Sequence, residues 1–178
     1  MPPTLPSLAA AFALALPSVA AAQSFEGPSV GLQLSYADAE TSGPALDGDD
    51  PLFGLRAYYD WDLGDYVIGT GLQYEAGDVG LTGGVATIDD VFRLAGRVGI
   101  TRGPGYYYVT AGYAYADTSG PAAAGSSDGY FIGIGYEGFV SDQVTLGAEL
   151  LYHEFDSFDI PTLEADVTTL NLSVNYRF

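Results

Sequence analysis

The chain has 178 residues, of which 23 are acidic and 5 basic, giving a net charge of −18. A surface this acidic repels polyanions, so we expect no nucleic-acid partner. The absence of cysteine excludes a disulfide framework and a cysteine-linked lipid anchor. With 24 glycines, 14 tyrosines and one methionine, the composition favours strands and tight turns over helices.

The first segment, residues 1–22, is predicted to be a signal peptide. Residues 8–22 are apolar and alanine-rich but too short to span a bilayer, and Ala20-Ala21-Ala22 is typical of a cleavage site. The segment departs from the usual pattern because no Lys or Arg precedes Arg56. Residues 23–178 are then predicted to form one domain, long enough for a small barrel but not for a second module.

Connections of two lengths alternate along this domain. The long polar ones fall at residues 38–51, 77–90, 117–128 and 155–166, and the short ones at residues 62–65, 101–105 and 140–143. Bacterial outer-membrane barrels have even numbers of antiparallel strands, short periplasmic turns and long outer loops. The alternation therefore predicts an all-β, eight-stranded antiparallel transmembrane up-and-down β-barrel with both termini in the periplasm.

Within each predicted strand, alternate residues differ in polarity. One parity is apolar and is predicted to face lipid, with its aromatic residues near the strand ends, as expected at membrane interfaces. On the periplasmic side these are Tyr59, Trp61, Tyr66, Tyr107 and Phe178, and on the outer side Tyr36, Tyr74, Tyr115, Tyr130 and Tyr152.

The opposite parity is small or ionic and is predicted to face the lumen, which disfavours a soluble lipocalin-like barrel with an apolar interior. We expect its charges to pair, because an unpaired charge in a narrow lumen is costly. The predicted ionic network consists of Arg56, Asp60, Glu75, Arg93, Arg97, Glu137 and Glu149. We expect Asp60, Arg97 and Glu137 in a low layer. Arg56 or Arg93 should pair with Glu149 at mid-height, and Glu75 and His153 should lie toward the outer rim.

The last predicted strand reaches the C-terminus. Residues 170–178 alternate apolar and polar without a break and end on an aromatic residue. This is typical of the final strand of a membrane barrel. We expect Tyr176 and Phe178 to form the C-terminal signal for the barrel assembly machinery.

Three stretches carry a resemblance to a known family: YYVTAGYAY at residues 107–115, GAELLYHEFD at 147–156 and VNYRF at 174–178. Over roughly residues 25–178, the chain resembles the small outer-membrane β-barrel proteins of the opacity and porin-like group, among them alphaproteobacterial surface antigens. The resemblance implies an integral protein of the bacterial outer membrane with a porin, adhesin or envelope-stabilising role. It implies no catalytic residues.

The residues themselves favour a structural or surface-interaction protein, with a low-conductance porin for small cationic solutes as the alternative. An enzyme is disfavoured, because no motif supplies a serine nucleophile and an orienting group for His153, the single histidine. We interpret His153 as a rim residue among loop carboxylates. One histidine without cysteine is a weak basis for a metal or haem site, so we expect no cofactor.

Acidic residues are concentrated at one predicted end of the barrel. Of the 23, 15 fall in or beside the four long connections. The expected partners are outer-membrane lipid and lipopolysaccharide, with divalent cations or a basic partner at the loops. A solvated charged surface without a specific ligand is the alternative interpretation. We expect a monomer.

Overall fold

The computed structural model describes residues 24–41, 51–80, 87–119, 125–155 and 165–178. The predicted signal peptide and its cleavage site lie outside the described residues. Eight strands make up most of the described chain: β1 (Gly27–Thr41), β2 (Pro51–Asp62), β3 (Val67–Gly80), β4 (Thr87–Arg102), β5 (Gly105–Ser119), β6 (Gly125–Phe139), β7 (Val144–Phe155) and β8 (Ala165–Arg177). The described residues contain no helix able to cross a membrane.

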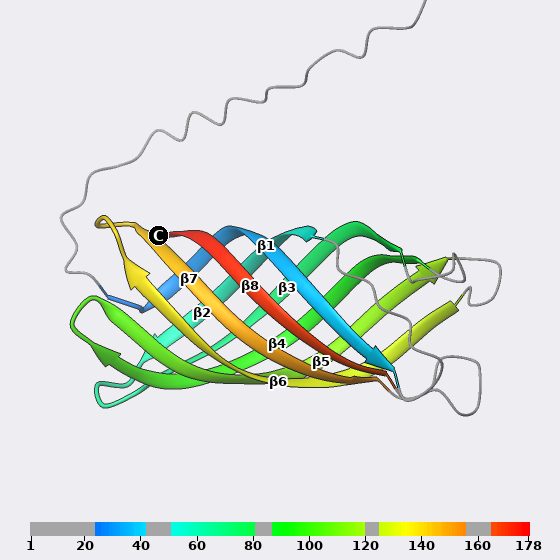
Figure 1. Ribbon diagram of the computed structural model, residues 1–178. Helices are drawn as coiled ribbons and strands as arrows, with labels where there is room; N and C mark the ends of the chain where they lie inside the picture. The colour runs from blue at the N-terminus through cyan, green and yellow to red at the C-terminus, as the bar shows by residue number, and fades with distance from the viewer. Residues whose placement is uncertain (1–23, 42–50, 81–86, 120–124, 156–164) are drawn as a thin grey trace, which may run out of the picture.

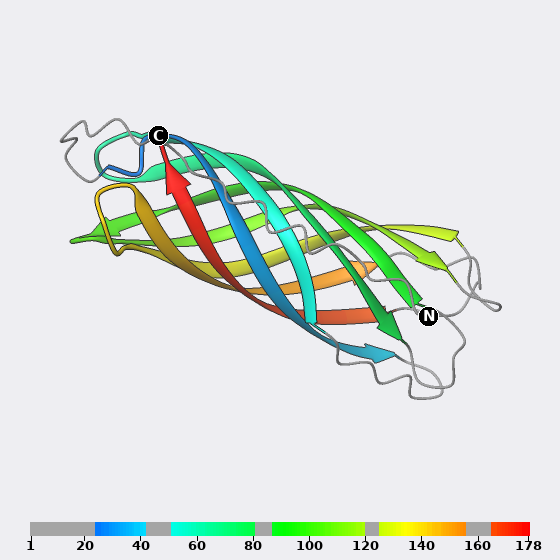
Figure 2. The same ribbon diagram turned by 90° about the horizontal axis from the view of Figure 1, so that it is seen from above.

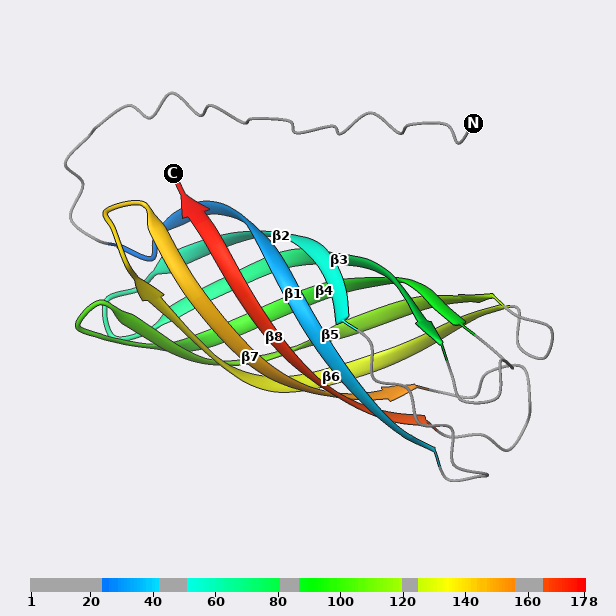
Figure 3. The same cartoon turned by 45° about the horizontal axis from the view of Figure 1, so that its top comes forward.

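The strands form one closed antiparallel barrel, which confirms the predicted fold class (Figure 1). Each strand pairs with the next one in sequence, and β8 closes the barrel by pairing with β1. Cα partners followed from Ser29 around all eight strands lead back to Ala39, ten residues further along β1. This offset tilts the strands steeply across the barrel (Figure 3).

The two ends of the barrel differ in their connections. Short turns at residues 63–66, 103–104 and 140–143 lie at one end, where β1 begins and β8 ends (Figure 2). We call this the short-turn end, and the opposite one the long-loop end. Gly64 and Gly103 take positive φ angles of 90° and 57° within two of these turns, a conformation that glycine adopts without a steric penalty.

The strands run further toward the long-loop end than predicted. Strand pairing continues through Asp38 on β1, Asp90 on β4 and Asp117 on β5, all of which were expected in or beside loops. Strands of 12 to 16 residues exceed the roughly 9–11 residues that cross a bilayer. Strand pairing uses main-chain N–H and C=O groups, so it can continue through acidic residues beyond the apolar layer.

The predicted division between the two faces is confirmed. On β1, Leu32 is 66% exposed on the outer wall, whereas the next residue, Gln33, is 4% exposed in the lumen. The lumen, however, is not only small and ionic, which corrects that expectation. One apolar cluster near the short-turn end contains Phe25, Val67, Tyr106 and Tyr108, and a second contains Tyr58, Val91, Ala95, Ala114, Ala116, Phe131, Leu151 and Val167.

Candidate functional site: the charged network of the lumen

Inward glycines let large side chains lie across the lumen. Gly71 on β3 lies beneath the ring of Tyr58 from β2, and Gly135 on β6 lies beneath the ring of Tyr108 from β5; a Cβ atom at either glycine would overlap the ring. An eight-stranded barrel has an interior about wide enough for side chains to fill. The missing Cβ atoms at these glycines therefore leave room for the tyrosine rings to pack against the main chain and fill the lumen.

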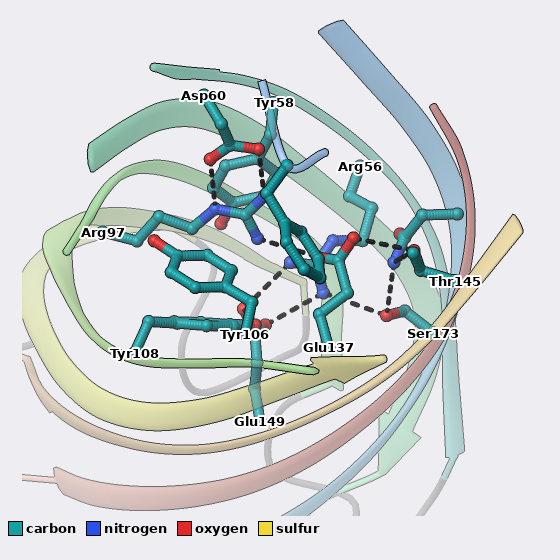
Figure 4. A network of polar contacts seen from close by, with 12 residues as sticks. Arg56, Tyr58, Asp60, Arg97, Tyr106, Tyr108, Glu137, Thr145, Glu149 and Ser173 are labelled. Carbon is teal, nitrogen blue, oxygen red and sulfur yellow. Dashed lines mark hydrogen bonds and ion pairs between the residues drawn. The ribbon is translucent and has the colours of Figure 1, made fainter. Parts of the chain in front are cut away.

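Four charged side chains from alternate strands meet near the short-turn end. Figure 4 labels three of them, Asp60, Arg97 and Glu137. Arg97 on β4 donates from Nε and Nη2 to the two carboxylate oxygens of Asp60 on β2, at 2.8 and 2.6 Å. Its Nη1 reaches Glu137 on β6 at 3.1 Å. Arg177 on β8 donates to the same two carboxylates at 2.8 and 3.0 Å. We call Asp60, Arg97, Glu137 and Arg177 the lower cluster.

Three tyrosine rings surround the guanidinium of Arg97. Its Cζ lies 4.1 Å from the ring centroid of Tyr58, 5.3 Å from that of Tyr106 and 5.1 Å from that of Tyr108. The ring of Tyr58 also lies 4.8 Å from Cζ of Arg56. Cation–π contacts of this kind stabilise a cation that has lost its water, and here Tyr58 connects two of them.

Arg56 on β2 and Glu149 on β7 form the middle pair, which crosses the lumen (Figure 4). Arg56 Nη2 and Nη1 donate to the two carboxylate oxygens of Glu149 at 2.9 and 3.1 Å. Glu149 also accepts hydrogen bonds from the Tyr108 hydroxyl at 2.7 Å and from Gln73 Nε2 at 3.2 Å. The carboxylate therefore has partners from three other strands, and its bidentate pairing with Arg56 is the geometry of a strong ion pair.

Glu75 on β3 organises the upper cluster, which consists of Gln33, Ser35, Glu75, Arg93 and His153. Its carboxylate accepts hydrogen bonds from Arg93 Nη1 and Gln33 Nε2, both at 2.5 Å, and from the Ser35 hydroxyl. Arg93 Nε donates to His153 Nε2 at 2.8 Å. Arg93 was a candidate partner for Glu149, but it lies on the strand next to Glu75, whereas Glu149 projects from β7.

The expectation that His153 lies at the rim among loop carboxylates is wrong. Its side chain is 1% exposed, and its ring lies 5.5 Å from that of Phe131. Strand parity turns His153 to the same side as Glu149, and inside the lumen its ring contacts Arg93 and the main chain of β8 in place of loop carboxylates. Nδ1 lies 3.2 Å from the carbonyl oxygen of Val167, and Nε2 accepts from Arg93.

The three groups together contain four arginines and four carboxylates, so this network has no net formal charge. None of these eight residues is more than 4% exposed. Removing such groups from water is costly unless each one has a close partner of opposite charge. Each charged group of this network therefore has a close partner of opposite charge.

All seven residues of the predicted network lie in the lumen, and pairing sorts them into the two clusters and the middle pair. The predicted network left out Tyr106, Tyr108 and Arg177. A signal for the tyrosines was present, because the run Tyr106-Tyr107-Tyr108 directly follows a short turn. Alternation sends the first and third rings inward and the second outward.

No set of three or more His, Asp or Glu side chains in the described part of the chain could hold a metal ion. At the C-terminus, Phe178 is 64% exposed and its ring meets that of Tyr176 edge-on at 4.9 Å. The Phe178 N–H donates to the Pro28 carbonyl oxygen at 3.1 Å, which joins the chain end to the start of β1.

A family model described as the outer membrane protein β-barrel domain matches residues 7–178. No curated protein matches the sequence. Among solved structures, the chain is similar to Ail, the attachment invasion locus protein of Yersinia pestis, in complex with the heparin analogue sucrose octasulfate. That match has 17% identity and a TM-score of 0.61, and it covers 86% of this chain and 99% of that one.

The chain is also similar to Neisserial surface protein A, with 16% identity and a TM-score of 0.58 over 86% of this chain and 98% of that one. At these identities, both likenesses show a shared barrel fold.

Proposed function

We propose that this chain acts as a closed barrel. It belongs to the family of outer-membrane β-barrel domains and is an integral protein of the bacterial outer membrane. In this proposal its role is structural or lies in surface interactions, and it catalyses no reaction. The observation that carries the proposal is the buried, charge-balanced network of the lumen. The lower cluster, the middle pair and the upper cluster follow one another along the barrel, and each contains at least one arginine bonded to a carboxylate.

The alternative is a low-conductance porin for small cationic solutes. A cation passing the middle pair would have to displace Arg56 from Glu149, where the guanidinium forms two hydrogen bonds. Separating a buried pair costs about 3–5 kcal/mol, and the lower and upper clusters would add similar barriers in series. This argument favours a closed lumen over a pore.

Single-channel recording in planar bilayers tests the proposal. We expect the wild-type protein to give no conductance steps and Glu149→Ala to give more current, with selectivity shifted away from cations. The matched control is Leu150→Ala, because Leu150 is the next residue but faces outward. Cation-selective steps from the folded wild-type protein would instead favour the porin.

We propose that the long-loop end is outside the cell and interacts with cationic partners. All arginines except Arg102 project into the lumen, Arg102 lies beside a short turn, and the sequence contains no lysine. No lysine and no outward-facing arginine therefore accompanies the 15 acidic residues in or beside the predicted long connections. Arg93, three residues after Asp90, pairs with Glu75 inside the lumen. Suitable partners are a basic protein or divalent cations that bridge to phosphates of lipopolysaccharide.

The charge at this end also argues against a polyanionic ligand. Sucrose octasulfate is the ligand in the Ail structure, whereas a net charge of −18 makes binding of that compound unfavourable for this chain. On intact cells, we expect polylysine to bind in a salt-sensitive manner and sucrose octasulfate not to bind. Equal binding of the two probes would contradict the proposed preference for cations.

A tag-accessibility experiment tests the orientation. A tag inserted within residues 117–128 should be reachable by antibody on intact cells, and one within residues 140–143 should be reachable only after permeabilisation. The opposite result would reverse the barrel in the membrane. We further propose a monomer, since each of the eight described strands already pairs with a neighbouring strand on both sides.

We propose that Tyr176 and Phe178 are the signal for the barrel assembly machinery. Their paired rings project outward from the end of β8, where a folding factor could reach them. Phe178→Asp should leave protease-sensitive protein in the periplasm and little heat-modifiable folded barrel. Leu172→Ala, on the same face of β8 but away from the end, serves as the control. Normal levels of folded Phe178→Asp protein would show that Phe178 is not needed as an assembly signal.

A further inference from the structure

The segment before β1 turns back into the mouth of the barrel. Gly27 has a φ of 104°, in the left-handed region, which redirects the chain at the start of the strand. The Ser24 hydroxyl accepts a hydrogen bond from the Glu26 N–H at 3.1 Å, closing a tight turn. Ser24 and Glu26 are exposed, whereas Phe25 between them is 3% exposed. The turn thus inserts one apolar side chain and leaves its neighbours in water.

The ring of Phe25 packs below the lower cluster. Its centroid lies 5.2 Å from that of Tyr106 and 4.7 Å from that of Phe139, which come from the ends of β5 and β6 nearest the short turns. The guanidinium of Arg177 lies 5.1 Å from the same ring. Phe25 therefore stands between the ion pairs of the lower cluster and the solvent at the short-turn end.

Arg177 connects this segment to the last strand. Its Nη2 donates to the carbonyl oxygen of Phe25 and, at 2.8 Å, to Asp60. Arg177 lies on β8, directly opposite Ser29 of β1. The residues just before the first strand are thus bonded to the second-to-last residue of the chain, across the seam where β1 and β8 meet. These contacts can form only once β8 has taken its place beside β1.

We infer that residues 24–27 are a latch that docks after the barrel has closed, seals the short-turn mouth of the lumen through Phe25 and holds the β1–β8 seam through Arg177. The latch rests on the proposed closed lumen and adds a closing device at one mouth. The latch distinguishes the lower cluster from the middle pair, because the lower cluster is capped by Phe25 from the segment before β1. The middle pair is held by strand residues alone.

The absence of native cysteine allows a clean accessibility test. Ser29 faces inward at the start of β1, is 4% exposed and lies opposite Arg177, so Ser29→Cys reports on the mouth. In folded protein, a membrane-impermeant maleimide should label Cys at this position slowly. Labelling should become roughly tenfold faster or more when Phe25→Ala is added, because reactivity follows exposure of the thiol. Glu26→Cys, at an exposed position, should label rapidly with or without Phe25.

A second variant covers the case in which Phe25→Ala fails to fold. Gly27→Ala retains the ring but disfavours the left-handed turn that inserts it, and its Cβ would make only an ordinary contact, 3.5 Å from the Phe178 carbonyl oxygen. It should also accelerate labelling of Ser29→Cys. Labelling rates unchanged by both substitutions would overturn the latch.

Hydrogen exchange tests the seam. Phe25→Ala should speed amide exchange in peptides from the start of β1 and the end of β8, and leave the paired middle segments of β3 and β4 unchanged. Exchange that changes nowhere, or equally in all strands, would show that Phe25 contributes only general packing. The outcomes separate the two proposals: conductance by the wild type would overturn the closed lumen, whereas rapid Ser29→Cys labelling in a non-conducting barrel would overturn the latch alone.

Discussion

The lumen and the lipid-facing wall are built from neighbouring residues of the same strands, but they are stabilised in different ways. On β7, Glu149 is 1% exposed and bonded to Arg56, whereas the next residue, Leu150, is 47% exposed on the outer wall. The wall requires only apolar side chains, because lipid adapts to their shape. The lumen requires particular partners at particular distances. On the wall, one apolar residue should therefore be able to replace another with little loss of stability. In the lumen, even a chemically similar replacement should destabilise the barrel.

The largest effect should come from breaking the middle pair. Glu149→Ala leaves the guanidinium of Arg56 without its carboxylate and deprives Tyr108 and Gln73 of an acceptor. Removing one partner of a buried pair costs about 3–5 kcal/mol. We expect the free energy of unfolding, measured by urea titration in detergent micelles, to fall by that amount.

Leu150→Ala is the control on the wall for this substitution. It shortens a side chain that contacts lipid or detergent, and substitutions at exposed positions usually change stability little. The free energy of unfolding should therefore fall by less than about 1 kcal/mol. A loss for Leu150→Ala equal to that for Glu149→Ala would contradict the comparison between lumen and wall.

A charge placed on the wall should have the next largest effect. Leu150→Arg puts a guanidinium into the apolar layer near the middle of β7, where strand partners Ile134 and Leu170 are also apolar. Arginine on the lipid face costs about 2–4 kcal/mol at the bilayer midplane. Unfolding in phospholipid bilayers should show this loss, and unfolding in short-chain detergent should show less of it. An equal loss in both media would indicate a packing defect instead.

The wall could be predicted from the sequence almost completely, because a membrane imposes one simple rule on it. Every second residue between the short turns must be apolar, so Leu32 and Leu150 could be assigned outward without knowledge of any partner. The eight strands followed from the alternation of connection lengths. Their outer bounds did not, because pairing beyond the bilayer depends on backbone hydrogen bonds and not on the polarity of residues such as Asp90.

The lumen could be predicted only in part. Parity places Arg93, Glu75 and Glu149 on the inner face, but the choice between the two carboxylates depends on strand order and on the ten-residue offset around the barrel. Polarity also misses aromatic residues that face inward. Tyr106 and Phe131 fit there because the lumen is packed with side chains and does not need to be polar throughout.

Deleting a tyrosine hydroxyl compares the two faces at equal hydrogen-bond length. The hydroxyls of Tyr108 and Tyr74 each donate to a carboxylate at 2.7 Å, to Glu149 in the lumen and to Asp90 on the outer face. A buried hydrogen bond to a charged group contributes about 1.5–3 kcal/mol. Tyr108→Phe should therefore lower the free energy of unfolding by that amount, and Tyr74→Phe by less than about 1 kcal/mol. Similar losses for the two variants would mean that burial does not strengthen the bond in the lumen.

Two glycines give the finest version of the comparison. Gly71 faces the lumen, where an added Cβ would overlap the Tyr58 ring and the Ala57 carbonyl oxygen, whereas at Gly96 on the outer face the nearest atom would be the Ala111 carbonyl oxygen at 3.8 Å. Backbone cannot move aside easily, so Gly71→Ala should destabilise the barrel by about 1–3 kcal/mol through overpacking. Gly96→Ala should be neutral or slightly stabilising, because alanine restricts the unfolded chain. Thermal unfolding of the two variants side by side measures the difference, and a stability for Gly71→Ala equal to that of Gly96→Ala would mean that the lumen is packed loosely enough to accept new side chains.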